Sequence, residues 1–168
     1  MDAGWHRAYL SLGSNIDAGM NLALAFAALR GRFGEVVFSP VYRTAAVGFA
    51  GADFLNAAAI IETRLDPVEL DAWLHAYEDA HGRDRRGPRF CDRSIDIDLV
   101  LYDAQVLHGP GHLQLPRPEL AHAFVLRPLA DIAPDAPIPG QGRTVGEAWR
   151  AHPEFGSAAD RVEVEDLG

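Results

Sequence analysis

Residues 94–102, Ser-Ile-Asp-Ile-Asp-Leu-Val-Leu-Tyr, restrict the fold of this chain more than any other segment. Polar and apolar side chains alternate as far as Leu99, and an apolar run then follows. A period of two is typical of a β-strand whose two faces differ in polarity, and the apolar run indicates that the strand continues into the core. The segment therefore predicts a strand with Asp96 and Asp98 on one face, about 7 Å apart along the chain.

Strand and helix patterns alternate along the rest of the chain. Strands are expected at Ala8–Leu12, Val36–Tyr42 and Phe54–Thr63, and one arm of a hairpin at Val106–Leu115, interrupted by Gly109-Pro110-Gly111. The expected helical segments are Asn21–Arg30, closed by Gly31 and Gly34, a helix that starts at Asp66-Pro67-Val68-Glu69, and Phe124–Ile132. This order predicts an α+β fold with helices packed on a sheet. No linker or repeat divides the chain, so we expect one domain over residues 1–168, with a turn at 13–15, loops at 43–53 and 82–93, and a frayed tail at 159–168.

The composition excludes several kinds of chemistry. All 15 basic residues are arginine, and without lysine the chain has no P-loop, no Schiff-base catalysis and no Ser-Lys nucleophile pair. With 24 acidic residues the formal net charge is −9, which argues against sequence-independent binding of nucleic acid. A lone cysteine, Cys91, excludes an intramolecular disulfide and a Cys-based zinc finger. The N-terminus has no apolar signal core and no stretch approaches a membrane span, so we expect a soluble cytoplasmic protein.

The paired carboxylates Asp96 and Asp98 are the first candidate site. A half-exposed strand with a polar outer face would also explain them. Two carboxylates this close repel each other unless a cation or a proton intervenes, however, and such a pair suits Mg²⁺, which fills its other positions with water and phosphate oxygens. The pair predicts the metal site of a nucleotide, whereas His108 and His112, separated by Gly-Pro-Gly, give little support for zinc.

A basic loop directly precedes this strand. Residues 82–93 contain two glycines, one proline and five arginines, namely Arg83, Arg85, Arg86, Arg89 and Arg93. A solvated loop or a loop that contacts RNA would have the same composition. The planar guanidinium group matches phosphate oxygens, and several of them hold a polyphosphate and offset charge that develops during transfer. Beside a metal-binding pair, the loop favours phosphoryl transfer without a P-loop.

A third candidate site lies on the strand Phe54–Thr63. Phe54 and Asn56 share a face, which places an aromatic plane beside an amide that both donates and accepts hydrogen bonds. Such a pair can stack on a flat heterocycle and bind its polar edge. The alternative is a plain core phenylalanine beside an asparagine that is satisfied by backbone groups.

Taken together, these segments resemble the 6-hydroxymethyl-7,8-dihydropterin pyrophosphokinase family over about residues 8–150. The motifs that carry the resemblance are Tyr9-Leu10-Ser11-Leu12-Gly13-Ser14-Asn15, Ser39-Pro40-Val41-Tyr42-Arg43-Thr44, Phe54-Leu55-Asn56-Ala57, Arg93-Ser94-Ile95-Asp96-Ile97-Asp98-Leu99 and Leu115-Pro116-Arg117-Pro118. The resemblance implies a ferredoxin-like fold with a mainly antiparallel sheet. It also implies transfer of pyrophosphate from ATP to a pterin alcohol in folate biosynthesis, with small-molecule substrates alone as partners and a monomeric enzyme.

The resemblance assigns roles to individual residues. Asp96 and Asp98 would bind two Mg²⁺ ions, and Arg83 and Arg93 would be the catalytic arginines. The residues expected near ATP are His75, Glu78, Arg83, Arg85, Arg93 and Arg117. Those expected around the pterin are Thr44, Val47, Phe54, Asn56 and Phe124, with the two phenylalanines on opposite faces of the ring.

The chain departs from the family pattern at three places. Cys91-Asp92 replaces a Gly-Pro that often precedes the motif arginine, and Arg117 stands where many members have histidine. Ala121-His122-Ala123 lacks an arginine that often precedes the second aromatic, so Arg117 is expected to take over phosphate contacts. Two rival functions stay open on the sequence: another Mg²⁺-dependent phosphotransferase or nucleotidyltransferase, and a non-catalytic ferredoxin-like ligand-sensing module.

Overall fold

The structure is a computed structural model that describes residues 4–45, 51–81 and 94–165. Its centre is a six-stranded sheet with the order β10-β3-β4-β1-β5, in which β2 also pairs with β4. Every pairing in this sheet is antiparallel. The strands are β1 (His6–Ser14), β2 (Val37–Phe38), β3 (Val41–Thr44), β4 (Phe54–Thr63), β5 (Asp96–Tyr102) and β10 (Asp160–Val162).

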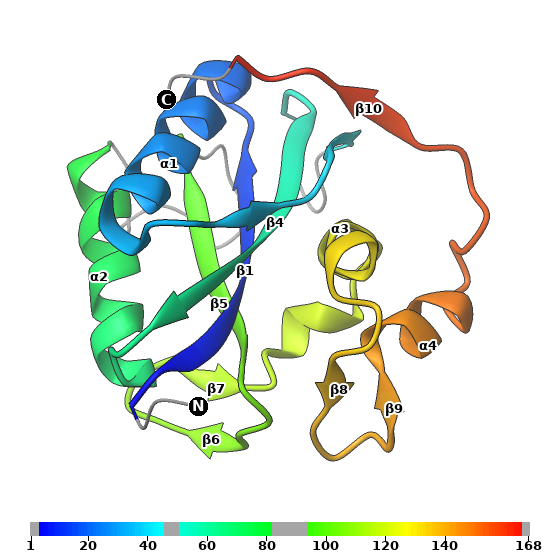
Figure 1. The fold of residues 1–168 in the computed structure, drawn as a ribbon. Coiled ribbons are helices and arrows are strands. Elements are labelled where there is room, and N and C mark those ends of the chain that lie inside the picture. The colour runs from blue at the N-terminus through cyan, green and yellow to red at the C-terminus, as the bar shows by residue number, and fades with distance from the viewer. Residues whose placement is uncertain (1–3, 46–50, 82–93, 166–168) are drawn as a thin grey trace.

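Helices cover both faces of this sheet (Figure 1). The helices α1 (Ala18–Phe33) and α2 (Pro67–Ala80) lie on one face, and α3 (Ala123–Ile132) lies on the other, beside α4 (Val145–Arg150). Two small hairpins, β6–β7 (Leu107–His108 and Gln114–Leu115) and β8–β9 (Pro137–Ile138 and Arg143–Thr144), and the 3₁₀ helix η1 (Pro118–Ala121) complete the described elements. Among the described residues, no helix is both long and apolar enough to cross a membrane.

Alternating side chains of the sheet divide the core into two clusters. On the α1 and α2 face, Leu10 and Leu12 of β1 pack with Ile97 and Leu99 of β5. The cluster on the α3 face includes Tyr9, which follows the strand period of two. Both clusters use the same central strands, so the sheet joins them into one packed unit.

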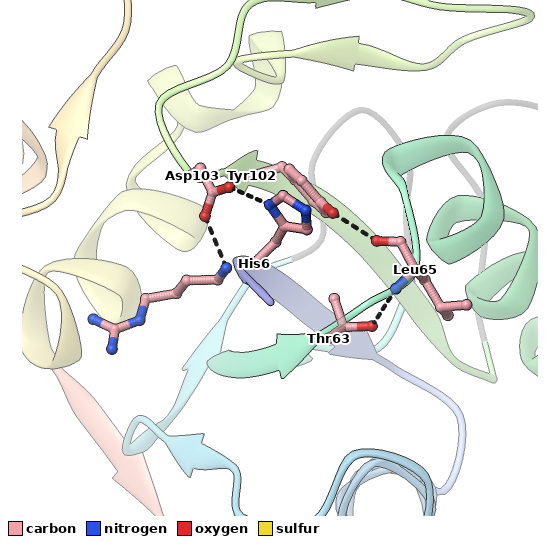
Figure 2. A network of polar contacts seen from close by, with 6 residues as sticks. His6, Thr63, Leu65, Tyr102 and Asp103 are labelled. Atoms are coloured by element: carbon pink, nitrogen blue, oxygen red, sulfur yellow. Dashed lines mark hydrogen bonds and ion pairs between the residues drawn. The ribbon is translucent and has the colours of Figure 1, made fainter. Parts of the chain in front are cut away.

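Polar contacts close the end of the sheet where β1 begins and β5 ends (Figure 2). His6 Nδ1 lies 2.7 Å from Asp103 Oδ2, and the backbone N–H of Arg7 donates to the other oxygen of that carboxylate at 2.8 Å. The Tyr102 hydroxyl donates to the Leu65 carbonyl oxygen at 2.6 Å. These contacts tie β1, β5 and the segment just before α2 together at this end of the sheet.

Several sequence-based boundaries hold. Phe54–Thr63 is a strand over the predicted range. The helix start at Asp66 has both hydrogen bonds of a capping box, since Asp66 accepts from the Glu69 N–H and Glu69 accepts from the Asp66 N–H. Phe124–Ile132 falls within α3, whereas Val106–Leu115, predicted as one interrupted hairpin arm, contains both arms of the hairpin β6–β7.

Other boundaries were wrong. The predicted strand Val36–Tyr42 is two short strands interrupted at Ser39-Pro40, where proline lacks an N–H for the ladder. The first helix extends past Gly31 to Phe33, and Gly34 ends it with a φ of +81°. The tail predicted to fray from residue 159 includes β10, which pairs with β3.

Candidate active site

Asp96 and Asp98 begin the edge strand β5, as the alternating sequence predicts. Both side chains are partly exposed, while Ile95 and Ile97 are each 1% exposed. In the antiparallel register, Asp96 lies opposite Gly13 and Asp98 opposite Ser11 of β1. The two carboxylates therefore lie near the end of the sheet opposite the contacts of Figure 2.

Glu78, near the end of α2, is a third carboxylate at this place. It is 1% exposed, and its Oε2 accepts a hydrogen bond from the backbone N–H of Ile97 at 2.7 Å. One carboxylate oxygen from each of Glu78, Asp96 and Asp98 lies within 4.8 Å of the others. Oxygen ligands of this kind suit a hard divalent cation such as Mg²⁺, so the residues present fit the metal that the sequence predicts.

Arg117 lies beside the same carboxylates. Its Nη2 atom is 3.3 Å from Asp98 Oδ1, and its Nε atom is 3.1 Å from Glu119 Oε2. The sequence predicted Arg117 for the nucleotide phosphates but gave no signal for Glu119, which reaches the site because the 3₁₀ helix η1 starts directly after Arg117. The structure thus brings Arg117 to the predicted metal ligands.

A second group of predicted residues gathers on β3 and β4. The Asn56 Nδ2 atom donates to Thr44 Oγ1 at 2.6 Å, and Thr44 lies opposite Phe54 in the register. Asn56 is 4% exposed. A Cβ atom at Gly13 would lie 3.0 Å from Asn56 Oδ1, so the glycine provides the space for this amide. The amide is thereby fixed on two sides.

Phe124 belongs to the first turn of α3. Its ring stacks on His122, with centroids 5.0 Å apart. Phe124 and Thr44 line one pocket of about 100 Å³, between β3, α3 and the segment 154–160. Phe54 and Asn56 are not among the residues that line this pocket, but Phe54 lies opposite Thr44, one of the lining residues, in the register of β3 and β4.

Tyr42 holds the wall of this pocket in place. Its hydroxyl donates a hydrogen bond to Asp131 of α3. Burial and that hydrogen bond raise the pKa of Tyr42, so its hydroxyl stays a donor over the physiological range. The guanidinium of Arg127 lies 5.8 Å from the Tyr42 ring centroid and 4.7 Å from that of Trp149. These contacts position β3 against α3, and so Thr44 against Phe124.

Ser14 and Asn15 fix the loops around the site. Ser14 Oγ donates to the Ser94 carbonyl oxygen at 2.5 Å, two residues before Asp96. Asn15 Nδ2 donates to the Ala52 carbonyl oxygen at 3.1 Å, just before β4. The sequence places both residues in a turn after the first strand and within a motif of the resemblance, but assigns neither a role, whereas the structure places Ser14 within β1.

The remaining predicted residues lie away from these contacts or outside the described ranges. His75 on α2 has a side chain that is 42% exposed and lies 3.6 Å from Asp71. Val47 and the loop residues Arg83, Arg85, Arg86, Arg89 and Arg93 fall outside the described residues, as do Cys91 and Asp92.

Comparison with known proteins gives consistent results. The family model for 7,8-dihydro-6-hydroxymethylpterin-pyrophosphokinase matches residues 9–134. A 2-amino-4-hydroxy-6-hydroxymethyldihydropteridine pyrophosphokinase of Pseudomonas aeruginosa is 37% identical over 152 residues, covering 88% of this chain and 92% of the relative. The protein of the same name from Methylorubrum extorquens is 46% identical over 148 residues, covering 84% of this chain and 90% of the relative.

Solved structures agree on the fold. A Plasmodium falciparum HPPK-DHPS triple mutant superposes with a TM-score of 0.68 at 12% identity, covering 87% of this chain and 41% of that longer chain. This likeness confirms the predicted ferredoxin-like α+β fold, with its antiparallel sheet and packed helices.

Proposed function

The chain belongs to the 7,8-dihydro-6-hydroxymethylpterin-pyrophosphokinase family, and on that basis we propose how its own residues carry out the family's reaction. The enzyme transfers pyrophosphate from ATP to 6-hydroxymethyl-7,8-dihydropterin in folate biosynthesis and uses Mg²⁺. The products are AMP and the pterin diphosphate.

Asp96 and Asp98 hold the metal in this proposal, and two ions bind there. The observation that carries it is the convergence of these carboxylates with Glu78 at the end of the sheet, within 4.8 Å of one another. When bound, Mg²⁺ neutralises negative charge on the phosphates and orients them. Glu78 supports the pair from α2, and His75 and Arg117 lie on the nucleotide side.

The pterin binds where β3, β4 and α3 meet. Asn56, oriented by Thr44, binds the polar edge of the ring, together with the backbone of Thr44 and Val47. Phe54 and Phe124 stack on the two faces of the ring. The support for this arrangement is the Asn56–Thr44 hydrogen bond and the shared pocket of Thr44 and Phe124.

The reaction needs no covalent intermediate. The pterin hydroxymethyl oxygen attacks the β-phosphorus of ATP in line with the bond to the α-phosphate oxygen, and that bond breaks to release AMP. The proton of the hydroxyl group leaves to a neighbouring carboxylate or to water. Arg83 and Arg93 stabilise the charge spread over the transferring group, and Arg85 contacts the nucleotide. Positioning supplies much of the acceleration.

The whole chain forms one pyrophosphokinase domain in this proposal and acts as a monomer in the cytoplasm. The two core clusters that share the central sheet support a single domain. The excess of acidic over basic residues in the sequence favours small-molecule substrates over nucleic acid.

Analysis of the nucleotide products tests this function. Purified protein with Mg-ATP should form AMP only when the hydroxymethyl dihydropterin is added, with one pterin diphosphate for each AMP. Formation of ADP, or of AMP in equal amounts without the pterin, would contradict it. A matched reaction with the pterin that lacks the hydroxyl group should form no product.

A further inference from the structure

Arg117 is held between two carboxylates at the edge of the metal site. Its Nη2 atom is 3.3 Å from Asp98 Oδ1, and its Nε atom is 3.1 Å from Glu119 Oε2. The Arg117 side chain is 19% exposed, so these charges are only partly screened by water. The Arg117 guanidinium therefore offsets the negative charge of Asp98, a carboxylate that the proposed function assigns to the metal.

Neither contact is a well-formed hydrogen bond. Charge-assisted N–H···O bonds are usually about 2.7–2.9 Å long, and the Nη2–Asp98 distance exceeds this range. The Nε atom is buried and has no hydrogen-bond partner among the described residues, because its approach to Glu119 has the distance but not the angle of one. An unsatisfied buried donor on a charged group is costly, so better acceptors can draw the guanidinium away. The oxygens of a polyphosphate match its planar fork.

The backbone of Arg117 is held in place, while its side chain can pair either with the two carboxylates or with phosphate oxygens. The Arg117 N–H donates to the Val100 carbonyl oxygen at 3.0 Å, which attaches it to β5, and the Arg117 carbonyl accepts from the Leu120 N–H at 3.1 Å. A change of partner by the guanidinium therefore requires rotation of the side chain only. Glu119, two residues further on in η1, remains within reach as an acceptor.

A cation that binds Asp98 competes with this guanidinium for the same carboxylate. Both carry positive charge, so each disfavours the other at one partly buried anion. The conflict disappears when a polyphosphate arrives with the metal, because the guanidinium then gains phosphate oxygens. Linkage requires the effect to be reciprocal, so nucleotide strengthens metal binding by the factor with which metal strengthens nucleotide binding.

We propose that Arg117 is a resident counter-ion of Asp98 that keeps metal affinity low in the empty site and makes metal binding depend on nucleotide. The proposal rests on the proposed function, since it takes Asp96 and Asp98 as the metal ligands. It goes further by giving Arg117 a role before ATP is bound. Glu119 limits that role because it shares the guanidinium with Asp98.

The test is a titration with Mn²⁺ in place of Mg²⁺, followed by electron paramagnetic resonance. Wild type and Arg117→Gln are compared with and without an ATP analogue in which a methylene group bridges the α- and β-phosphorus atoms. Arg143→Gln is the matched control, because its Nε donates to Gln141 in an exposed hairpin and the variant loses the same charge. Circular dichroism checks that each variant is folded.

We expect Arg117→Gln to bind Mn²⁺ alone about tenfold more tightly than wild type, within the roughly 5–150-fold range usual for coupled sites. With the analogue present the variant should bind Mn²⁺ no more tightly than wild type, so the gain in Mn²⁺ affinity caused by nucleotide falls about tenfold. Arg143→Gln should match wild type in both titrations.

A second variant guards against loss of folding. Glu119→Gln removes the negative charge that competes with Asp98 for the guanidinium, so Arg117 should pair more fully with Asp98 and Mn²⁺ alone should bind more weakly than in wild type. Equal affinities for Mn²⁺ alone in wild type and a folded Arg117→Gln, or tighter binding in Glu119→Gln, would overturn the inference. If wild type binds no Mn²⁺ even with the analogue, the proposed metal site itself fails, and the inference with it.

Discussion

The Glu78 carboxylate accepts a hydrogen bond from the backbone N–H of Ile97, which lies between the two proposed metal ligands. Within the described residues, β5 pairs on one side only, with β1, so this N–H has no strand partner. Glu78 satisfies it from α2 and brings a negative charge to the site. A single helix residue thus binds the strand backbone between Asp96 and Asp98.

Glu78→Gln and Glu78→Ala should separate these two contributions. The glutamine keeps an acceptor oxygen but loses the charge, so we expect little change in stability and a loss of metal affinity of roughly 10–100-fold. The alanine also leaves the buried Ile97 N–H unpaired, at a cost of about 1–3 kcal/mol in the free energy of unfolding. Urea unfolding and Mn²⁺ titration with an ATP analogue measure the two effects. Glu62→Gln, which alters an exposed ion pair with Arg7, is the control; metal affinity that is unchanged in Glu78→Gln would contradict the role.

Asp98→Ala should abolish pyrophosphate transfer and leave the fold intact. The side chain is partly exposed, so its loss creates no core cavity. Metal coordination stabilises transition-state charge by several kcal/mol, which corresponds to a loss of at least about 100-fold in rate. The rate of AMP formation in a single turnover compares the activity of the variant with that of wild type, and circular dichroism compares their folding. Retained turnover with Mg-ATP would remove Asp98 from the metal site.

Thr44→Val tests how the pterin amide is oriented. Valine keeps the shape of threonine but loses the oxygen that accepts from Asn56 Nδ2. We expect the KM for the pterin to rise about tenfold, the equivalent of one lost hydrogen bond of about 1.4 kcal/mol, with little change in the KM for ATP. Thr63→Val, at the other end of β4, removes an acceptor for the Leu65 N–H and serves as the control. Equal rises of both KM values in Thr44→Val would show a general disturbance instead.

Ionisation of Tyr102 should lower the free energy of unfolding as the pH becomes alkaline. Burial raises the pKa of its phenol to about 12, so the folded chain keeps a proton that the unfolded chain loses from about pH 10. The stabilisation is complete below pH 10 and is lost as the pH rises through 12, with a total of about 2–3 kcal/mol. Tyr102→Phe should flatten this decline while losing about 1 kcal/mol at pH 8, because the hydrogen bond to Leu65 is removed. Unfolding in urea between pH 8 and 11 measures it; parallel declines in the two proteins would contradict the assignment.

Local patterns predicted the parts of the fold that depend on neighbouring residues. The period of two in β5 gave the common face of Asp96 and Asp98, and the capping residues gave the start of α2. Pairings between distant segments could not be predicted in this way. The strand β10 joins β3 across more than a hundred residues, and its three residues have no apolar alternation to mark it.

The candidate site shows the same division. The sequence predicted Asp96 and Asp98 as metal ligands and, through resemblance, Arg117 and Glu78 as residues near the nucleotide. That Glu78 would bind the backbone of β5, and that Arg117 would face Asp98, depends on how α2 and η1 pack against an edge strand. The spacing of residues along a helix predicts on which face a side chain lies, but not which atom of another element it contacts.

Gly13 leaves room for the Asn56 side chain that a residue with a Cβ atom would partly fill. A methyl group there would press on the oxygen of Asn56 at 3.0 Å, although the strand backbone itself accepts any residue. Alanine at this position would keep the sheet but would require the Asn56 amide, which is proposed to bind the pterin, to shift by a few tenths of an ångström. The close approach of the Asn56 side chain, rather than the backbone conformation, is therefore what favours glycine at this position.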